Sequence, residues 1–285
     1  MKNFLLKHDS LDRVRLAISV SGSTDLSRLG LMESHFKLTL GEVVRSVLVA
    51  GGGVSYGGHL SADGYTSFMA NELHRFGRRT RPFHVVLAHH EHAKKTEGEL
   101  RGQIETLGLY GQIIALSADG KQVDPFFQRS SDPATVDGLQ QEQSLTSMRR
   151  FLTENSSAKL LMGGKRKDFQ GAMPGLLEEA ILAVEAAQPV YFAGGFGGIT
   201  SDLMRALEID GGEWLPQYPK LNTSELHVVP NLEKLKEAWL KNGMACCNNG
   251  LTEEERLVLA ISHRPSEIAT LVSLGLGRRF DVSTL

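Results

Sequence analysis

The sequence has 285 residues, of which 41% are hydrophobic and 22% are charged, with a formal net charge of −2 and a pI near 6.6. This length suits one large α/β domain, or one domain with a small appendage. The near-neutral charge gives no support to a basic surface for nucleic acid or a membrane, so we expect neither as a partner.

The cysteines and the hydrophobic segments disfavour other classes of protein. Cys246 and Cys247 are adjacent, which argues against an ordinary intramolecular disulfide, and no Cys/His spacing indicates a zinc site. The first residues lack the apolar core of a signal peptide, and no run is long enough to span a bilayer. We therefore expect a cytoplasmic protein with no metal or cofactor.

The start of the chain alternates apolar segments with turns of small residues. A buried strand over 16–20 ends in a Ser-Gly-Ser turn that suits contact with a ligand. Helical spacing from Glu33 gives way to a predicted strand over 46–50, which a glycine cluster over 51–59 follows. A helix is expected over 65–76. The residues of the two turns that we predict to bind a ligand are Gly22, Ser23, Tyr56, Gly57 and Gly58.

Three histidines follow the next predicted strand, which covers 83–88. His89, His90 and His92 flank a glutamate, but their spacing matches no pattern of metal ligands. We interpret them as part of a solvated loop or as a contact at the rim of a site. A further strand is predicted over 112–116, and the polar stretch 119–143 is predicted to be a long loop.

The middle of the chain combines glycine turns with basic residues. A predicted helix over 145–154 and a strand over 158–162 lead into this segment, and a helix over 176–187 follows it. Glycines beside three consecutive basic residues suit a phosphate, although a solvated basic loop has the same composition. The ligand-binding residues predicted here are Gly163, Gly164, Lys165, Arg166 and Gly175.

The next predicted strand, over 190–193, runs into a turn of four glycines and a phenylalanine before a hydroxyl-rich helix start. Open α/β sheets build phosphate cradles in this way, because backbone N–H groups and the helix dipole face the anion. A tight turn that binds nothing has the same sequence pattern. The ligand-binding residues predicted here are Gly194, Gly195, Phe196, Gly197, Gly198 and Thr200.

The C-terminal residues 211–285 are interpreted as an irregular connection followed by helices. We expect them to pack as an extension on a domain formed by residues 1–210. Strands that alternate with helices and end in glycines predict an α/β, Rossmann-like doubly wound fold with a mainly parallel sheet. The motif G-x-G-x-x-G is absent after the first strand, which disfavours a hydride-transferring dehydrogenase.

Four segments together resemble a known superfamily. They are Ser21–Ser23, Tyr56–His59, Gly163–Glu179 and Gly194–Gly198, and their order and spacing are more specific than any one of them. On these motifs the chain resembles the SLOG superfamily. Its Rossmann-like domains include the Lonely-guy phosphoribohydrolases, the Smf/DprA proteins and the amino-terminal regions of TRPM channels. Within it, the chain is most similar to prokaryotic SLOG proteins found with TIR domains and in antiphage systems.

The resemblance implies a pocket for a nucleotide-derived ligand at the carboxyl ends of the strands. In antiphage SLOG sensors the pocket binds cyclic ADP-ribose-type signals made by TIR proteins. This implies an NAD- or ADP-ribose-related ligand, a TIR-domain or other defence partner, and a homo-oligomer. In the phosphoribohydrolases, the glutamate of P-G-G-x-G-T-x-x-E acts at the ribose. Here Pro174-Gly175 is followed by Leu176-Leu177 instead of glycine-threonine, and Glu178 or Glu179 takes the place of that acid.

Two function classes follow from these observations. The first is a sensor that binds a nucleotide-derived signal in a stress or antiphage pathway. The second is an N-glycosidic hydrolase of nucleoside monophosphates, with Glu178 or Glu179 as the catalytic carboxylate. A scaffold that acts only in assembly is a third reading, and both glutamates could be ordinary residues of a helix start. The changed motif after Pro174-Gly175 favours the sensor.

Overall fold

The chain folds around a seven-stranded sheet. The structure is a computed structural model that describes residues 9–58, 64–76, 80, 82–126, 137–209 and 229–280. In chain order the strands are Arg15–Ser21 (β1), Gly53–Gly57 (β2), Phe83–Leu87 (β3), Gly111–Leu116 (β4), Gln122–Val123 (β5), Ala158–Gly163 (β6) and Val190–Ala193 (β7). Their order across the sheet is β5-β4-β3-β2-β1-β6-β7, and all neighbours are parallel except β4 and β5.

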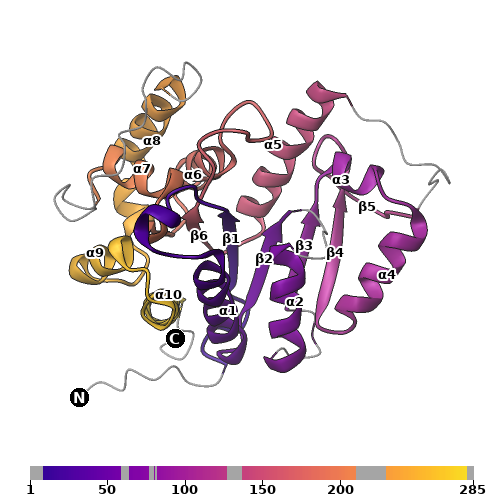
Figure 1. Ribbon diagram of the computed structural model, residues 1–285, viewed down its shortest axis with the longest axis horizontal. Helices are drawn as coiled ribbons and strands as arrows, with labels where there is room; N and C mark the ends of the chain where they lie inside the picture. The colour runs from indigo at the N-terminus through magenta and orange to yellow at the C-terminus, as the bar shows by residue number, and fades with distance from the viewer. Residues whose placement is uncertain are drawn as a thin grey trace.

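Helices cover both faces of the sheet (Figure 1). Glu33–Val49 (α1) and Tyr65–Phe76 (α2) pack on one face, and Gly138–Glu154 (α5) and Gly175–Glu185 (α6) pack on the other. Most strand side chains are buried, because a parallel sheet is covered on both sides. The predicted Rossmann-like α/β fold is confirmed. The other helices are His89–Ala93 (α3), Glu97–Leu107 (α4), Gly198–Ala206 (α7), Val229–Cys247 (α8), Glu253–Ile261 (α9) and Pro265–Phe280 (α10), with 3-10 turns at Ser27–Leu29 and Gly194–Phe196.

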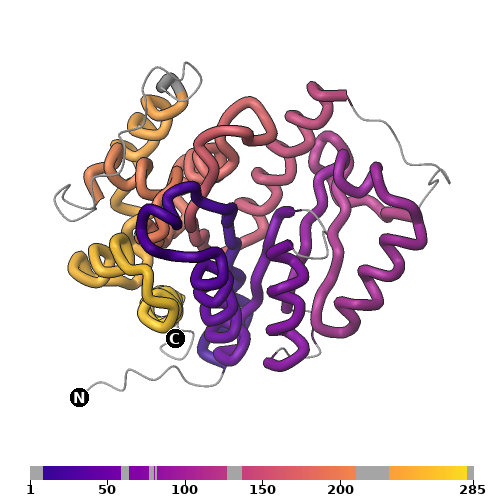
Figure 2. Tube along the Cα trace, viewed as in Figure 1, coloured from indigo at the N-terminus to yellow at the C-terminus, as the bar shows by residue number. Residues whose placement is uncertain are grey.

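The C-terminal helices pack against the sheet domain. Helix α10 packs on α1, α8 packs on α6, and α9 packs on β7; Figure 2 shows α10, in yellow, beside the indigo α1. The Tyr191 hydroxyl of β7 donates a hydrogen bond to the Asn249 carbonyl over 2.6 Å. These helices therefore contribute to the same hydrophobic clusters as the strands of the sheet. The predicted boundary at residue 210, and the predicted irregular connection as far as residue 228, lie outside the described residues.

The predicted strand over 46–50 is wrong. Helix α1 continues to Val49, and the strand is β2, inside the predicted glycine cluster. Valines favour strands, but Val43, Val44 and Val47 are all buried at helical spacing against the sheet. The tertiary packing of one helical face therefore outweighs local β propensity.

The stretch predicted as a long loop contains regular structure at both ends. Strand β5 forms the sheet edge, and α5 begins at Gly138, where the Asp137 carboxylate accepts a hydrogen bond from the Gln140 N–H over 2.8 Å. Residues 127–136 lie outside the described residues. Helix α4, for which we predicted nothing, carries a capping box formed by Thr96 and Glu99.

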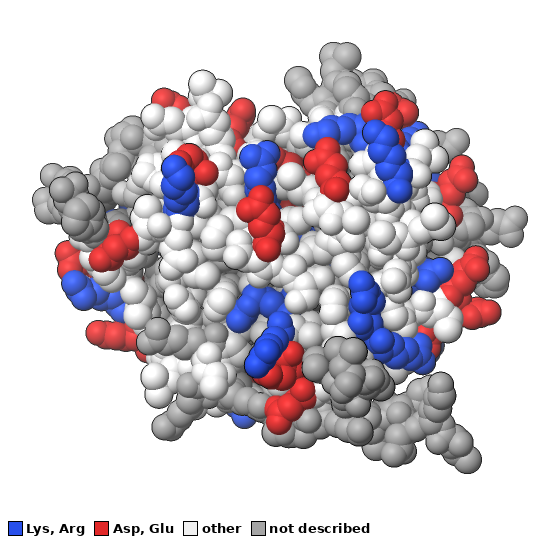
Figure 3. All heavy atoms as spheres, turned by 180° about the vertical axis from the view of Figure 1, so that it is seen from behind, with Lys and Arg blue, Asp and Glu red and all other residues white. Residues whose placement is uncertain are grey.

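Neither the described helices nor the charges on the described part of the face in Figure 3 indicate a membrane span or a surface for nucleic acid. Within the described ranges, every helix is too short or too polar to cross a bilayer. On the described part of the face in Figure 3, basic and acidic side chains lie in small mixed groups. The described part of that face therefore carries no continuous basic surface of the kind that binds nucleic acid.

Candidate functional site

A cleft of about 570 Å³ lies at the carboxyl ends of the central strands. Val20, Ser21 and Gly22 line it at the end of β1, and Tyr56, Gly57 and Gly58 line it at the end of β2. The segment 165–176 and helix α5 supply another wall. From β1 the strands β2, β3 and β4 follow one another toward one edge of the sheet, and β6 and β7 lie on the other side of β1. The direction of the strand order therefore reverses between β1 and β6, which is the topological switch point. Open α/β sheets bind ligands in this position.

A tight turn after β6 directs the chain over the cleft. Gly163 has φ +72°, and a Cβ there would be 2.5 Å from the Ser21 carbonyl oxygen, so only glycine fits. The Gly164 N–H donates to the same carbonyl over 3.0 Å, and the Lys165 N–H donates to the Ser21 hydroxyl over 3.3 Å. The backbone of this turn therefore joins the end of β6 to the end of β1 and places Lys165 in the lining of the cleft.

Two cations of the described residues line the cleft, and they differ in their partners. Arg149 of α5 is buried, forms an ion pair with Glu178 and lies beside Gly175. The Thr146 hydroxyl donates a hydrogen bond to the same Glu178 carboxylate over 2.5 Å. Lys165 is exposed, and no carboxylate of the described residues pairs with it. Lys165 is therefore the side-chain cation that is available to an anionic ligand.

The start of helix α6 also faces the cleft. Gly175 and Leu176 line it, and the residue before the helix, Pro174, provides no side-chain cap. The first N–H groups of a helix carry partial positive charge and favour an anion. Lys165 and this helix start can together bind a phosphate group.

Glu179 is a carboxylate of the cleft, and polar groups behind the cleft hold it. Ser19 of β1 donates a hydrogen bond to its Oε2 atom, and Lys159 of β6 lies 3.4 Å from the same oxygen. Lys159 is fully buried and also donates to the Thr153 hydroxyl over 3.0 Å. Burial lowers the pKa of Lys159, and the nearby Glu179 carboxylate opposes that effect.

Two tyrosines supply aromatic surface and hydroxyl groups to the cleft. Burial raises the pKa of Tyr56 above its ordinary value, with Tyr65 and Glu179 adding to the effect. Burial and the charge of Glu33 raise the pKa of Tyr65 to about 12. Both hydroxyls are protonated at neutral pH, so they can donate hydrogen bonds to a ligand, and their rings can contact a planar base.

The structure places only some of the predicted ligand-binding residues at the cleft. Gly163 and Gly164 form the turn behind it, and the Ser23 hydroxyl instead accepts a hydrogen bond from the Asp25 N–H over 3.2 Å. Glu178, unlike Glu179, is not part of the lining. The predicted residues that line the cleft are Gly22, Tyr56, Gly57, Gly58, Lys165, Gly175 and Glu179. His59 lies outside the described residues.

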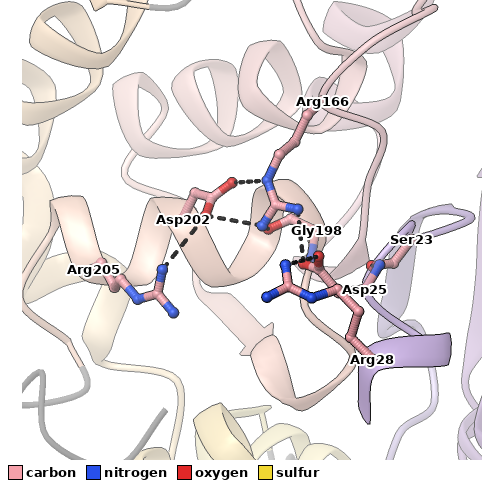
Figure 4. A network of polar contacts seen from close by, with 7 residues as sticks. All are labelled: Ser23, Asp25, Arg28, Arg166, Gly198, Asp202 and Arg205. Atoms are coloured by element: carbon pink, nitrogen blue, oxygen red, sulfur yellow. Dashed lines mark hydrogen bonds and ion pairs between the residues drawn. The ribbon is translucent and has the colours of Figure 1, made fainter. Parts of the chain in front are cut away.

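Arg166 is not part of the cleft lining, and its guanidinium instead contacts a buried acidic network (Figure 4). Its Nε atom donates to Asp202 over 2.6 Å, and its Nη1 atom lies 2.8 Å from the Asp25 carboxylate. The Gly198 N–H donates to the same carboxylate over 2.8 Å. Arg166 therefore anchors the basic segment to α7 and to the loop after β1, and its charge is neutralised by protein carboxylates.

The glycine turn after β7 does not reach the cleft, contrary to our expectation that it would. A Cβ on Gly195 would be 2.0 Å from the Ser262 carbonyl oxygen at the end of α9, so the C-terminal helices cover this turn. The Phe196 ring is fully buried and packs edge-on against Phe36, and the Thr200 side chain is also buried. Here the glycines allow close packing, because Gly194, Gly195, Gly197 and Gly198 all lie against other parts of the protein.

The three histidines are also placed differently from the prediction. They lie in helix α3, where His90 and His92 are buried. The His90 Nδ1 atom is 2.8 Å from the Ser144 hydroxyl, and the His92 Nε2 atom is 2.8 Å from the Leu116 carbonyl oxygen. These contacts attach α3 to its neighbours. Within the described residues, no group of three or more metal-binding side chains is found.

Sequence reasoning missed several residues that line the cleft. Arg149 lies on the buried face of an amphipathic helix, and only its tertiary contact with Glu178 identifies it. Tyr65 begins α2, a few residues after the glycine cluster, and this position could have indicated a site residue. Glu33 and Glu91 are acidic residues of helix first turns, where carboxylates are common for other reasons.

Comparison with known proteins identifies the family. A family model described as SLOG cluster2 matches residues 10–259, which include all seven strands and the whole cleft lining. A search of curated proteins finds no significant match.

Proposed function

Because the chain belongs to the SLOG superfamily, we propose that its cleft binds a nucleotide-derived ligand related to NAD or ADP-ribose. The position of the cleft supports this proposal most directly. It lies at the switch point of the sheet, where the glycines of β1 and β2, the start of α6 and Lys165 meet. Such a site offers N–H groups and one cation to a phosphate, and tyrosine rings and hydroxyls to a base and a ribose.

A finer proposal concerns the origin of the ligand. We propose a cyclic ADP-ribose-type signal made by a TIR-domain protein in an antiphage or stress pathway, bound by a homo-oligomer of this chain. The resemblance of the chain to SLOG proteins of antiphage systems supports this origin of the ligand and the homo-oligomer. Sedimentation of the protein with and without cyclic ADP-ribose would test it, and a single monomeric species in both conditions would contradict the oligomer.

The experiment for the proposed binding uses calorimetry with AMP, NAD, ADP-ribose and cyclic ADP-ribose. Lys165→Ala removes the cation of the cleft, and Lys167→Ala, two residues away and outside the lining, is the matched control. We expect Lys165→Ala to weaken binding about tenfold, because a charge-assisted hydrogen bond is lost. Lys167→Ala should bind like the wild type. Absence of binding of every probe by the wild type would refute the proposal.

The position of Glu179 supports a second candidate, N-glycosidic hydrolysis of nucleoside monophosphates. Glu179 lines the cleft, whereas Glu178 is bound to Arg149, so a catalytic carboxylate would be Glu179. Chromatography of AMP incubated with the wild type would detect released adenine. If the chain is a hydrolase, Glu179→Gln should lower the rate by about 10²–10⁴-fold. Because Leu176-Leu177 replaces glycine-threonine, we expect no release.

A further inference from the structure

A fully buried lysine lies directly behind the cleft. Lys159 is the second residue of β6, an otherwise apolar strand, and its ammonium contacts Thr153 of α5 and Glu179 of α6. Burying an ammonium group is costly in free energy unless the charge is paired and hydrogen-bonded. Packing alone would favour an apolar residue here, so the presence of a lysine at this position requires another explanation.

The geometry of Glu179 suggests that explanation. Ser19 and Lys159 both contact the Oε2 atom of Glu179. Among the described residues no hydrogen bond to Oε1 is found, and Glu179 is part of the cleft lining. One oxygen of the carboxylate is thus held from behind, while the other is left for a group in the cleft.

We propose that Lys159 is a positioning residue that keeps Glu179 ionised and directed into the cleft, as an acceptor for ribose hydroxyls. This inference rests on the proposed function. An ionised carboxylate only accepts hydrogen bonds, which suits the donors of a ribose, and an adjacent cation favours that form. Such a carboxylate also repels phosphate, so it separates the ribose end of the cleft from the end where Lys165 and the start of α6 lie.

The other polar and charged groups around the pair do not replace Lys159. From α5, Arg149 acts on Lys159 as a like charge, but it is itself paired with Glu178. From β2, Tyr56 interacts with Glu179 and is protonated at neutral pH. From β1, Ser19 donates a hydrogen bond without a charge. Lys159 is therefore the cation in contact with the Glu179 carboxylate.

The test compares AMP with 2′-deoxy-AMP by calorimetry. We expect the wild type to prefer AMP about tenfold, the effect of one hydrogen bond to a charged group. Lys159→Gln keeps a hydrogen-bond donor and removes the charge; it should abolish the preference and leave the affinity for 2′-deoxy-AMP close to that of the wild type. Thr153→Val, the control, removes the other partner of Lys159 and should retain the preference. Lys159→Met should behave like Lys159→Gln.

A second measurement needs no ligand. In protein labelled with ¹³C at the glutamate carboxyl groups, the Glu179 carboxyl signal should move in Lys159→Gln relative to the wild type, because the adjacent ammonium group is lost. An unchanged Glu179 signal, or a retained preference for AMP in Lys159→Gln, would overturn the role of Lys159 while the proposed function stands. If the wild type binds neither AMP nor ADP-ribose, the proposed function fails and the ribose contact fails with it.

Discussion

Replacing Arg166 with alanine should cost the protein stability, because it leaves two buried carboxylates without their shared cation. The Asp25 and Asp202 side chains are 3% and 1% exposed, whereas that of Arg166 is 14% exposed. Asp25 would keep the Gly198 N–H and Arg28 at 3.9 Å, and among the described residues Asp202 would keep Arg205 at 3.8 Å. Breaking a buried ion pair from one side typically costs about 3–5 kcal/mol. Because some partners remain, we expect a loss of about 3 kcal/mol.

Urea unfolding at pH 7.5 would measure this loss. The double variant Arg166→Ala/Asp202→Asn should be less destabilised than the sum of the two single variants, because the amide removes one of the stranded charges. The loss should also shrink at pH 4.5, where a carboxylate without its cation takes up a proton more readily. A loss below about 1 kcal/mol at pH 7.5 would refute the reasoning, since it is the value of an exposed pair.

Three further predictions concern the interior. Gly195→Ala should destabilise the fold by about 2 kcal/mol or more, because the new Cβ would overlap the Ser262 carbonyl oxygen. Thermal unfolding would show this loss, and an unchanged midpoint would contradict the packing role of the turn. Glu178→Gln should cost about 3 kcal/mol by leaving Arg149 without its carboxylate, and adding Arg149→Met should restore part of that loss in urea unfolding. Burial and the charge of Arg15 lower the pKa of His84 to about 4. The unfolded chain therefore binds more protons between about pH 6.5 and 4, so stability falls as the pH falls through that window, and His84→Gln should flatten this part of the stability profile.

The sequence was sufficient to predict the fold class and much of the sheet, because the parallel strands are buried apolar runs. The runs 16–20, 83–88, 112–116, 158–162 and 190–193 all correspond to strands. The second strand was misplaced, because valines at helical spacing resemble a strand locally. Helix α4 was missed although Thr96 and Glu99 carry its start signal.

The candidate site was harder to predict, because glycine turns that bind ligands and glycine turns that allow packing have the same sequence. The turn after β6 lies next to the cleft, but the turn after β7 is covered by the end of α9, which is distant in the sequence. The position of the C-terminal helices decides between these two roles, and no local pattern encodes it. The roles of Lys159 and Arg149 are equally hidden in the sequence, because each is set by a contact with a glutamate of α6.

The basic residues at 165–167 show how tertiary contacts change the chemistry that a motif indicates. Lys165 lines the cleft, whereas Arg166 points away from it to Asp25 and Asp202. Arg149, far away in sequence, enters the cleft wall but is neutralised by Glu178. In the described part of the cleft, a ligand phosphate would thus meet one available side-chain cation together with the N–H groups at the start of α6. Because so few groups share this task, the comparison of Lys165→Ala with Lys167→Ala is a sharp test of whether the cleft binds a nucleotide.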